Sequence, residues 1–434
     1  MSQRLVVRGA RWPGDVAIEG GWITAVGDVP EHPGDDVLRV DGDIVTAGLV
    51  NTHHHLYQWL TRGHAVGCDL FGWLTELYPV WGGIEVDDVA VAATVGLGEL
   101  ALSGCTTAFD HHYLVPRGDD RVFDATVSAA RAVGLRLHLS RGSMDLGQSR
   151  GGLPPDHVVE DIDAILASTE RVIREHHDGE TVTVVVAPCS PFSVSPELMR
   201  ESAVLARLHG LRLHTHLAET VEENAYCLEH LGVRPLDLMD EWGWLADDVW
   251  FAHGVHFADD EVARIGAAGA GVAHCPSSNA RLAAGIARVT DLEAGGAPVG
   301  LGVDGVASNE VGRLFPELRQ ALYAARLRGP RAETFMPADA LRLATSGGAR
   351  CLGRDDIGRL EAGARADLAV WPGDDVTDIA DPVTALVLGP DRKVRHLLVG
   401  GQPVVRDGEL AGVDLPAVRR DLAARAARLR AHSR

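Results

Sequence analysis

The middle of the chain repeats one pattern, in which a short apolar run is followed by a stretch with helical periodicity. Apolar runs of this length are typical of buried strands, and apolar residues at helical spacing in segments such as 87–102 and 158–176 predict helices. Strands that alternate with helices form parallel sheets. Repetition over roughly 300 residues matches a (β/α)8 TIM barrel, so we expect an α/β protein of this fold, with a doubly wound sheet as the alternative. The eight expected strands lie at residues 45–55, 107–111, 135–141, 182–189, 211–216, 249–253, 271–275 and 299–304.

Both ends of the 434-residue chain have a different pattern. Short alternating segments closed by glycine occur before about residue 46 and return after Ile357, which is typical of antiparallel strands joined by tight turns. We therefore expect residues 1–46 and 356–413 to form a small composite β-sandwich domain beside a barrel of residues 47–355. Residues 414–434 begin with a capping aspartate and a proline and space apolar residues among arginines, which predicts a C-terminal helix on an acidic surface.

The charge balance excludes several classes of partner. Lysine and arginine number 40 against 61 aspartates and glutamates, a formal net charge of −21 that would repel a nucleic-acid backbone. No apolar stretch approaches the roughly 18 residues of a membrane span, and the N-terminal residues lack the apolar core of a signal peptide. The 6 cysteines are scattered singly, as in reduced proteins. We expect a cytoplasmic protein that binds neither nucleic acid nor a membrane.

Histidines and an aspartate stand where the expected strands end. His53 and His55 close the first strand and are two residues apart, so their side chains point the same way. His216 ends the fifth strand, His253 the sixth and Asp304 the last. The carboxyl ends of barrel strands meet at one rim, where active sites of this fold are built. Neutral imidazoles with a carboxylate suit Zn²⁺ or Fe²⁺. The sequence therefore predicts one metal ion, Zn²⁺ with Fe²⁺ as the alternative, bound by His53, His55, His216 and Asp304. Such an ion lowers the pKa of bound water from about 15.7 toward neutrality, which favours a hydrolase.

The order of these ligands resembles the amidohydrolase superfamily, in its mononuclear deaminase branch. Binuclear members carry a modified lysine at the end of the fourth strand, where this chain reads Ala-Pro-Cys-Ser at 187–190, so the resemblance implies one metal. It also implies the terminal β-sandwich, to which segment 363–368 would return the chain. A closer likeness is to the family of bacterial 8-oxoguanine deaminases. The matching segments are 51–58, 106–113, 140–144, 151–155, 187–194, 214–220, 274–279 and 302–309.

This resemblance implies a deaminase of a free, purine-like base: 8-oxoguanine, to give urate and ammonia, or isocytosine or guanine. It also implies a homo-oligomer. Residues 306–310 read Val-Ala-Ser-Asn-Glu where the family pattern is Ser-Ala-Ser-Asn-Asp, a departure that bears on substrate fit more than on the metal. An aminohydrolase of another azine, a pterin or an s-triazine, is the alternative, and a non-catalytic barrel scaffold is a third hypothesis. The Pro-Cys-x-x-Cys signature of nucleic-acid deaminases and glycine-rich phosphate loops are absent from the sequence, so a free base is expected rather than a nucleotide.

Catalytic roles are expected for Glu219, His253 and Asp304. An exocyclic amine leaves only when it is protonated, so the reaction needs an acid as well as a nucleophile. Glu219, three residues beyond His216, is placed to carry a proton from the attacking water to the ring, and Asp304 to pass another to the leaving amine. The resemblance gives His253 the task of polarising the substrate, and a role as a fifth ligand stays open.

Substrate-binding residues are expected among polar and aromatic side chains near the same rim. Gln58, Arg141 and Ser190 are candidates for the ring edges, because an amide-rich ring needs donors and acceptors there. Trp73, together with Trp81, is a candidate for covering the face of the ring. For Arg141 an ordinary salt bridge is the alternative, and for the tryptophans simple packing.

Overall fold

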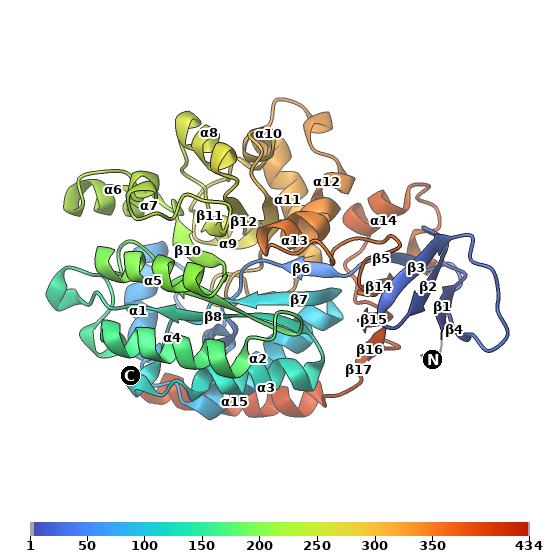
Figure 1. Ribbon diagram of the computed structural model, residues 1–434, viewed down its shortest axis with the longest axis horizontal. Coiled ribbons are helices and arrows are strands. Elements are labelled where there is room, and N and C mark those ends of the chain that lie inside the picture. The colour runs from blue at the N-terminus through green and yellow to red at the C-terminus, as the bar shows by residue number, and fades with distance from the viewer. Residues whose placement is uncertain (1–3, 433–434) are drawn as a thin grey trace.

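The computed structural model describes residues 4–432, and its largest sheet holds eight parallel strands in chain order (Figure 1). The amide of Thr52, just after the first of these strands, donates to the carbonyl oxygen of Leu301 in the last at 2.9 Å. This contact joins the two ends of the sheet and completes the (β/α)8 barrel that the sequence predicts. The strands are β6 (Leu49–Asn51), β7 (Cys105–Asp110), β8 (Arg136–Ser143), β9 (Val182–Pro188), β10 (Leu213–Leu217), β11 (Val249–His253), β12 (Gly271–His274) and β13 (Val299–Leu301).

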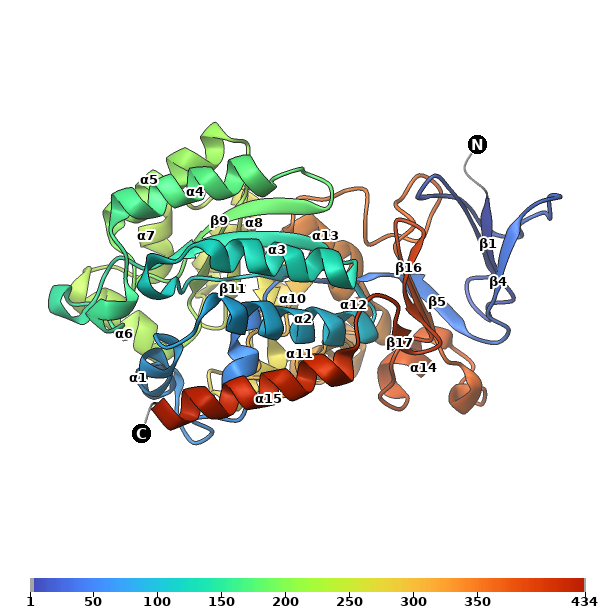
Figure 2. The ribbon, with the colours of Figure 1, turned by 90° about the horizontal axis from the view of Figure 1, so that it is seen from below.

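Helices cover the outside of the barrel (Figure 2). In α3 the buried residues include Val122, Val127, Ala130 and Val133, at the spacing of one helical face, and the helix ends at the left-handed Gly134. The helices of the barrel region are α1 (Leu70–Trp81), α2 (Val86–Leu102), α3 (Arg121–Val133), α4 (Ile162–His176), α5 (Pro196–Leu208), α6 (Val221–His230), α7 (Pro235–Glu241), α8 (Asp259–Ala268), α9 (Pro276–Arg281), α10 (Val289–Ala294), α11 (Leu314–Arg328), α12 (Pro337–Arg342) and α13 (Gly348–Cys351).

Two further sheets lie beside the barrel and are built from both ends of the chain (Figure 1). Their facing sides share one apolar core, which includes Val7 and Val16 from one sheet and Val45 and Leu368 from the other. This packing is the β-sandwich that the sequence predicts. One sheet has the order β3 (Trp22–Gly27), β2 (Asp15–Glu19), β1 (Leu5–Arg8) and β4 (Asp36–Arg39). The other has the order β17 (Glu409–Leu410), β16 (Gln402–Arg406), β15 (His396–Val399), β14 (Leu368–Trp371) and β5 (Ile44–Ala47), and α14 (Pro382–Leu388) follows β14.

The first expected strand, 45–55, is two strands in the structure. β5 pairs with β14 in the sandwich, whereas β6 pairs with β7 in the barrel. Gly48 separates them, and a side chain there would lie 2.2 Å from the Thr106 side chain. The chain therefore passes from one sheet to the other at a residue where only hydrogen fits, and the pattern of apolar residues does not mark that point.

The C-terminal helix, α15 (Leu415–His432), lies along α2 (Figure 2). Leu422 and Leu429 are buried, and Arg425 pairs with Asp88 of α2 at 3.1 Å. The arginine-rich tail thus packs on an acidic helix of its own chain, which is the arrangement that its composition indicates. Within residues 4–432, every helix is too short or too polar to cross a lipid bilayer.

Candidate metal centre and active site

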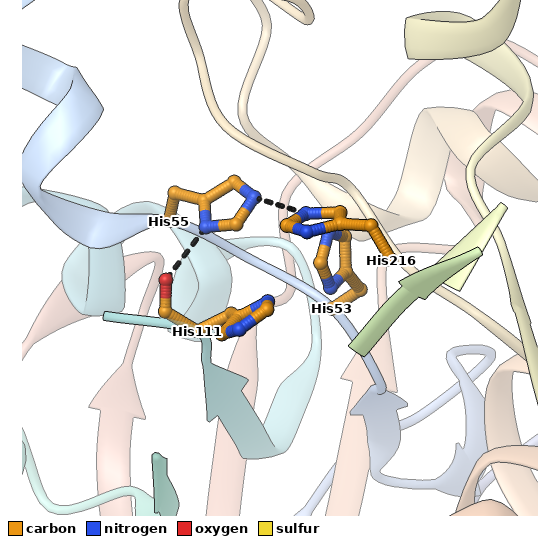
Figure 3. Close-up of side chains that lie close together, drawn as sticks. All are labelled: His53, His55, His111 and His216. Carbon is orange, nitrogen blue, oxygen red and sulfur yellow. Dashed lines mark hydrogen bonds between the residues drawn. The ribbon is translucent and has the colours of Figure 1, made fainter. Parts of the chain in front are cut away.

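Four side chains from three strand ends meet at the carboxyl end of the barrel, and Figure 3 draws three of them. His53 and His55 follow β6, His216 lies in β10, and Asp304 follows β13. Nε2 of His55 lies 3.2 Å from Nε2 of His216. Oδ1 of Asp304 lies 3.1 Å from Nε2 of His55 and 3.2 Å from Nε2 of His53. The four residues that the sequence predicts as ligands therefore surround one point.

Backbone carbonyls orient two of these imidazoles. Nδ1–H of His55 donates to the carbonyl oxygen of His111 at 2.7 Å (Figure 3), and Nδ1–H of His216 donates to that of Cys189 at 2.7 Å. A carbonyl oxygen only accepts, so each Nδ1 carries the proton and each Nε2 presents a lone pair to the centre. Metal-binding histidines are commonly oriented in this way.

A second histidine orients His53. Nδ1 of His214 lies 2.8 Å from the carbonyl oxygen of Trp250, to which it must donate. Nε2 of His214 is then an acceptor, and it lies 3.0 Å from Nδ1 of His53. His53 therefore donates from Nδ1, and its Nε2, which has no hydrogen-bond partner, also presents a lone pair to the centre.

The donor set suits one divalent cation. Ligands about 2.0–2.1 Å from a tetrahedral Zn²⁺ lie about 3.3 Å from one another, close to the spacings of 3.1 and 3.2 Å found here. His53 and His216 stay neutral, so protons do not compete with a cation for their lone pairs. Burial lowers the pKa of His53 to about 3. Burial and the neighbouring histidines hold the pKa of His216 well below its usual value. The centre is therefore a buried metal site.

Asp304 divides its two oxygens between the centre and the protein. Oδ2 accepts hydrogen bonds from the hydroxyl groups of Ser278 at 2.5 Å and Ser308 at 2.8 Å, which leaves Oδ1 facing the histidines. Burial alone would raise the pKa of Asp304, but the contacts with His53 and His55 bring it well below its usual value. The side chain is thus a carboxylate.

Glu219 and His253 lie next to this centre. Oε2 of Glu219 lies 3.5 Å from Nε2 of His253, and Nδ1–H of His253 donates to Oδ1 of Asn279 at 2.9 Å. Burial, with the carboxylates of Asp304 and Glu223, raises the pKa of Glu219 well above its usual value. A carboxyl group in this state can hold a proton near neutral pH and release it, as an acid–base catalyst must.

The backbone is strained at the rim. Six residues other than glycine within 4–432 have positive φ, and three of them are Ala218, beside Glu219, and His253 and Asp304 themselves. The left-handed conformation is unfavourable for such residues and is concentrated at functional sites. Their φ values are 52°, 72° and 60°.

A small cavity adjoins the centre, and its lining includes Gln58 and Trp73, two of the candidates for substrate binding. Both amide atoms of Gln58 are buried without a hydrogen-bond partner, whereas the Trp73 indole N–H donates to the carbonyl oxygen of Ala307 at 3.0 Å. The rest of the lining is His55, His216, His253, Glu219 and Asp304 with Leu70, Leu74, Tyr78, Tyr113, Cys189, Phe192 and Leu282.

The structure does not bring Arg141 and Ser190 into the cavity lining. The guanidinium of Arg141 donates to the carboxylate of Glu160 at 2.8 and 3.0 Å and to the Ser168 hydroxyl at 3.2 Å. The hydroxyl of Ser190 lies 2.7 Å from that of Ser193. Both side chains therefore have partners within the protein, and the contact of Arg141 with Glu160 is the salt bridge given as the alternative. A role of Arg141 and Ser190 in substrate binding stays a prediction.

The structure also shows where Trp81 lies and which residues near the centre were not predicted from the sequence. Trp81 is buried outside the lining and donates to the Thr61 hydroxyl at 3.0 Å, which is the packing alternative. His111, which is not among the predicted site residues, lies among His53, His55 and His216 (Figure 3), and its position at the end of the expected strand 107–111 is the signal that could have found it. The tyrosines and leucines of the lining come from α1, from the loop after β7 and, for Leu282, from the end of α9, and the sequence carries no comparable signal for them.

A barrel whose strand ends hold three histidines and an aspartate around one point defines a metal-dependent hydrolase. Residues 44–404 match the model of the amidohydrolase family, and the chain belongs to this family. It is 48% identical to an 8-oxoguanine deaminase from Pseudomonas aeruginosa, with 93% of this chain and 92% of that protein covered. It is 36% identical to an isoxanthopterin deaminase from an unknown prokaryote, covering 94% and 90%.

Solved structures agree with this assignment. The atrazine chlorohydrolase from Arthrobacter aurescens TC1 in complex with zinc superimposes with a TM-score of 0.91 at 31% identity, over 97% of this chain and all of that one (100%). The chain is therefore a metal-dependent deaminase of the amidohydrolase family, an enzyme that hydrolyses C–N bonds of cyclic amidines.

Proposed function

We propose that the chain hydrolyses the amino group of a free purine-like base, with 8-oxoguanine as the preferred substrate and urate and ammonia as the products. The observation that carries this proposal is the cavity, which combines a metal centre and a buried acid with the unpartnered amide of Gln58. Buried polar atoms without partners are rare in folded proteins, so these atoms call for a polar ligand. Likeness to the 8-oxoguanine deaminase over 93% of the chain supports this choice of ring.

His53, His55, His216 and Asp304 would hold one Zn²⁺, with Fe²⁺ as the alternative. When bound, the ion makes water a nucleophile at neutral pH and stabilises negative charge on the oxygen that attacks the ring. The zinc-bound structure of the related chlorohydrolase supports zinc.

The protein residues supply the proton transfers. Glu219 takes a proton from the attacking water and gives it to the ring nitrogen beside the carbon that bears the amine, for which its raised pKa suits it. Asp304, ionised and held by two serines, takes up the second proton of the attacking water and passes it to the departing amine. His253 keeps Nε2 toward the cavity, where it polarises the substrate or approaches the ion as a fifth ligand.

Gln58 and the walls of the cavity would bind the ring. The amide of Gln58 offers a donor and an acceptor to the polar edge of the base. Trp73, Leu74 and Phe192 supply apolar surface for its faces. Val306 and Glu310, where the sequence departs from the family pattern, are outside the lining, so the departure leaves these contacts intact.

Ammonia release from a panel of bases tests the proposal. Purified protein loaded with Zn²⁺ or Fe²⁺ is assayed against 8-oxoguanine, guanine, isocytosine, isoxanthopterin and an amino-s-triazine. We expect the highest kcat/KM for 8-oxoguanine. A higher value for the pterin, which likeness to the isoxanthopterin deaminase favours as the second candidate, would replace the proposed ring. No ammonia release from any base of the panel would refute the proposal that the protein deaminates free bases.

Two expectations from the sequence remain proposals. The homo-oligomer is checked by sedimentation of the purified protein, and a location in the cytoplasm by fractionation of cells that produce it.

A further inference from the structure

We infer that Glu223 is a positioning residue for deamination, an inference that rests on the proposed role of Glu219. Glu223 lies in the first turn of α6, directly after the rim loop, and its side chain is fully buried. Oε1 of Glu223 accepts a hydrogen bond from the amide of Ala218 at 2.9 Å, and Oε2 accepts one from the amide of Glu219 at 2.9 Å. One carboxylate therefore binds the backbone on which Glu219 is carried.

The two amides lie on either side of the strained residue in this loop. Ala218 has a φ of 52°, a left-handed conformation that an alanine rarely adopts. Its φ turns about the bond from its own nitrogen, and its ψ sets the direction of the next peptide, which carries the nitrogen of Glu219. Because Glu223 binds both nitrogens, it fixes both torsions of Ala218.

This turn decides where Glu219 points. The chain leaves β10 at Leu217, reverses at Ala218 and brings Glu219 back to within 3.5 Å of His253. A relaxed Ala218 with negative φ would direct the next residue elsewhere. We conclude that Glu223 holds the carboxyl group of Glu219 against the cavity.

Capping of a helix does not account for these contacts. In a capping box, a glutamate at the third helical position bonds back to the amide of the capping residue, and that residue here is Thr220. The two oxygens of Glu223 instead bind the two residues before Thr220, and the Thr220 hydroxyl has no hydrogen-bond partner. The carboxylate is thus directed at the loop that carries Glu219.

The test compares Glu223→Gln with Glu222→Gln, which removes a neighbouring carboxylate in the same helical turn. The glutamine at 223 keeps one acceptor and turns an N–H toward the other amide. We expect kcat on the best substrate of the panel to fall about 10–100-fold with KM changed less than about twofold, because the acid is displaced while the ring still binds. Metal content should be unchanged, and Glu222→Gln should match the wild type.

Hydrogen exchange and a double variant separate positioning from stability. The amides of Ala218 and Glu219 should exchange at least about tenfold faster in Glu223→Gln, whereas those of α6 beyond its first turn keep their rates. In a Glu219→Gln background the change at 223 should add less than about a twofold loss, because its effect passes through Glu219. If Glu223→Gln does not fold, Glu223→Asp, whose carboxylate is one methylene shorter, takes its place.

Three results would overturn the inference: a kcat within about twofold of the wild type, losses that multiply in the double variant, or unchanged exchange at the two amides. Exchange is measured without substrate. If the wild-type protein releases no ammonia from any base, the proposed function is refuted. The hydrogen-exchange rates of Ala218 and Glu219 would still show whether Glu223 fixes the turn.

Discussion

Nδ1 of His53 lies 3.0 Å from Nε2 of His214, and this contact determines which nitrogen of His53 faces the metal centre. The link continues from His214 to the carbonyl oxygen of Trp250 at 2.8 Å, and the Trp250 indole donates to the carbonyl oxygen of Thr52 at 3.1 Å. Two strands that hold ligands, β6 and β10, are thereby connected beneath the site. The hydrogen bonds set the tautomer of a ligand as well as its orientation.

We predict that His214→Leu weakens metal binding about 10–100-fold, the usual effect of losing a partner of a ligand. His214→Gln should bind metal more tightly than His214→Leu, because its side-chain oxygen can accept the proton of His53 Nδ1. Metal affinity is measured by competition with a chelator. His138→Leu is the control, since His138 is another buried barrel histidine and its ring nitrogens have no partner. Equal affinities for the leucine and glutamine variants at 214 would contradict the prediction.

Glu219→Gln should retain metal and lose activity. The amide cannot carry a proton between water and ring, so kcat should fall about 10²–10⁴-fold, the range expected for an acid–base group. Metal content by elemental analysis should remain at one ion per chain, because Glu219 is outside the predicted ligand set. Wild-type turnover would remove Glu219 from the mechanism, and loss of metal would make it a ligand.

Gly305→Ala should disturb substrate binding through Gln58. A side-chain carbon on Gly305 would lie 1.7 Å from Oε1 of Gln58, so the amide must move. We expect a higher KM, about tenfold, with metal content unchanged, and a similar effect from Gln58→Leu, because a buried hydrogen bond contributes about 0.5–1.5 kcal/mol. Gly67→Ala is the control, since Gly67 is exposed with no atom near the added carbon. A KM within about twofold of the wild type would place Gln58 away from the substrate.

The metal site was predictable because two periodicities locate it. Alternation along the expected strand 45–55 puts His53 and His55 on one side, although β6 itself ends at Asn51, and the barrel brings every strand end to one rim. The same alternation explains why Arg141 is not among the residues that line the cavity. In β8, Arg141 aligns with Val186 of β9, whose side chain packs in the layer between barrel and helices, whereas Ser140 aligns with Val185 in the barrel interior. Sequence alone does not tell which of two neighbouring residues faces inward when both are polar.

Residues whose positions depend on long-range contacts were harder to predict from the sequence. Arg141 binds Glu160, 19 residues away, and Ser168, 27 residues away. These spacings do not predict that the side chains meet. Likewise, the role of Gly305 depends on how closely Gln58 packs against it in three dimensions. The pattern of apolar and polar residues predicts which side of a helix or strand is buried, but it does not predict which residues pack against that side.

Arg141→Met should change stability and leave substrate preference unchanged. The side chain of Arg141 is fully buried and that of Glu160 is 11% exposed, so the methionine leaves Glu160 without its cation. Breaking such a pair from one side costs about 3–5 kcal/mol. Denaturant unfolding measures the loss, and Arg141→Met with Glu160→Met should recover part of it. A changed ranking of substrates would instead return Arg141 to the cavity.

The ion pair between Arg354 and Asp356 predicts a pH-dependent contribution to folding at the junction of barrel and sandwich. Two hydrogen bonds of 2.7 and 2.8 Å join the side chains, and Arg365 adds a third at 3.3 Å. Burial alone would raise the pKa of Asp356, but Arg354 and Arg365 lower it from 3.8 to about 2. A carboxyl group with a lowered pKa stabilises the fold fully above its unfolded value of 3.8, and this contribution is lost as the pH falls through about 2.

Asp356→Asn should therefore lower the free energy of unfolding by about 1–2 kcal/mol at pH 6, a value reduced from the full shift because the side chain is 22% exposed. At pH 3 about half of that difference should remain, since most unfolded chains are then protonated at this group. Urea unfolding of both proteins at the two pH values gives the comparison. Asp355→Asn is the control, because Asp355 is exposed beside it. A difference that is constant from pH 6 to pH 3 would show that the asparagine acts through shape and not through the lost charge.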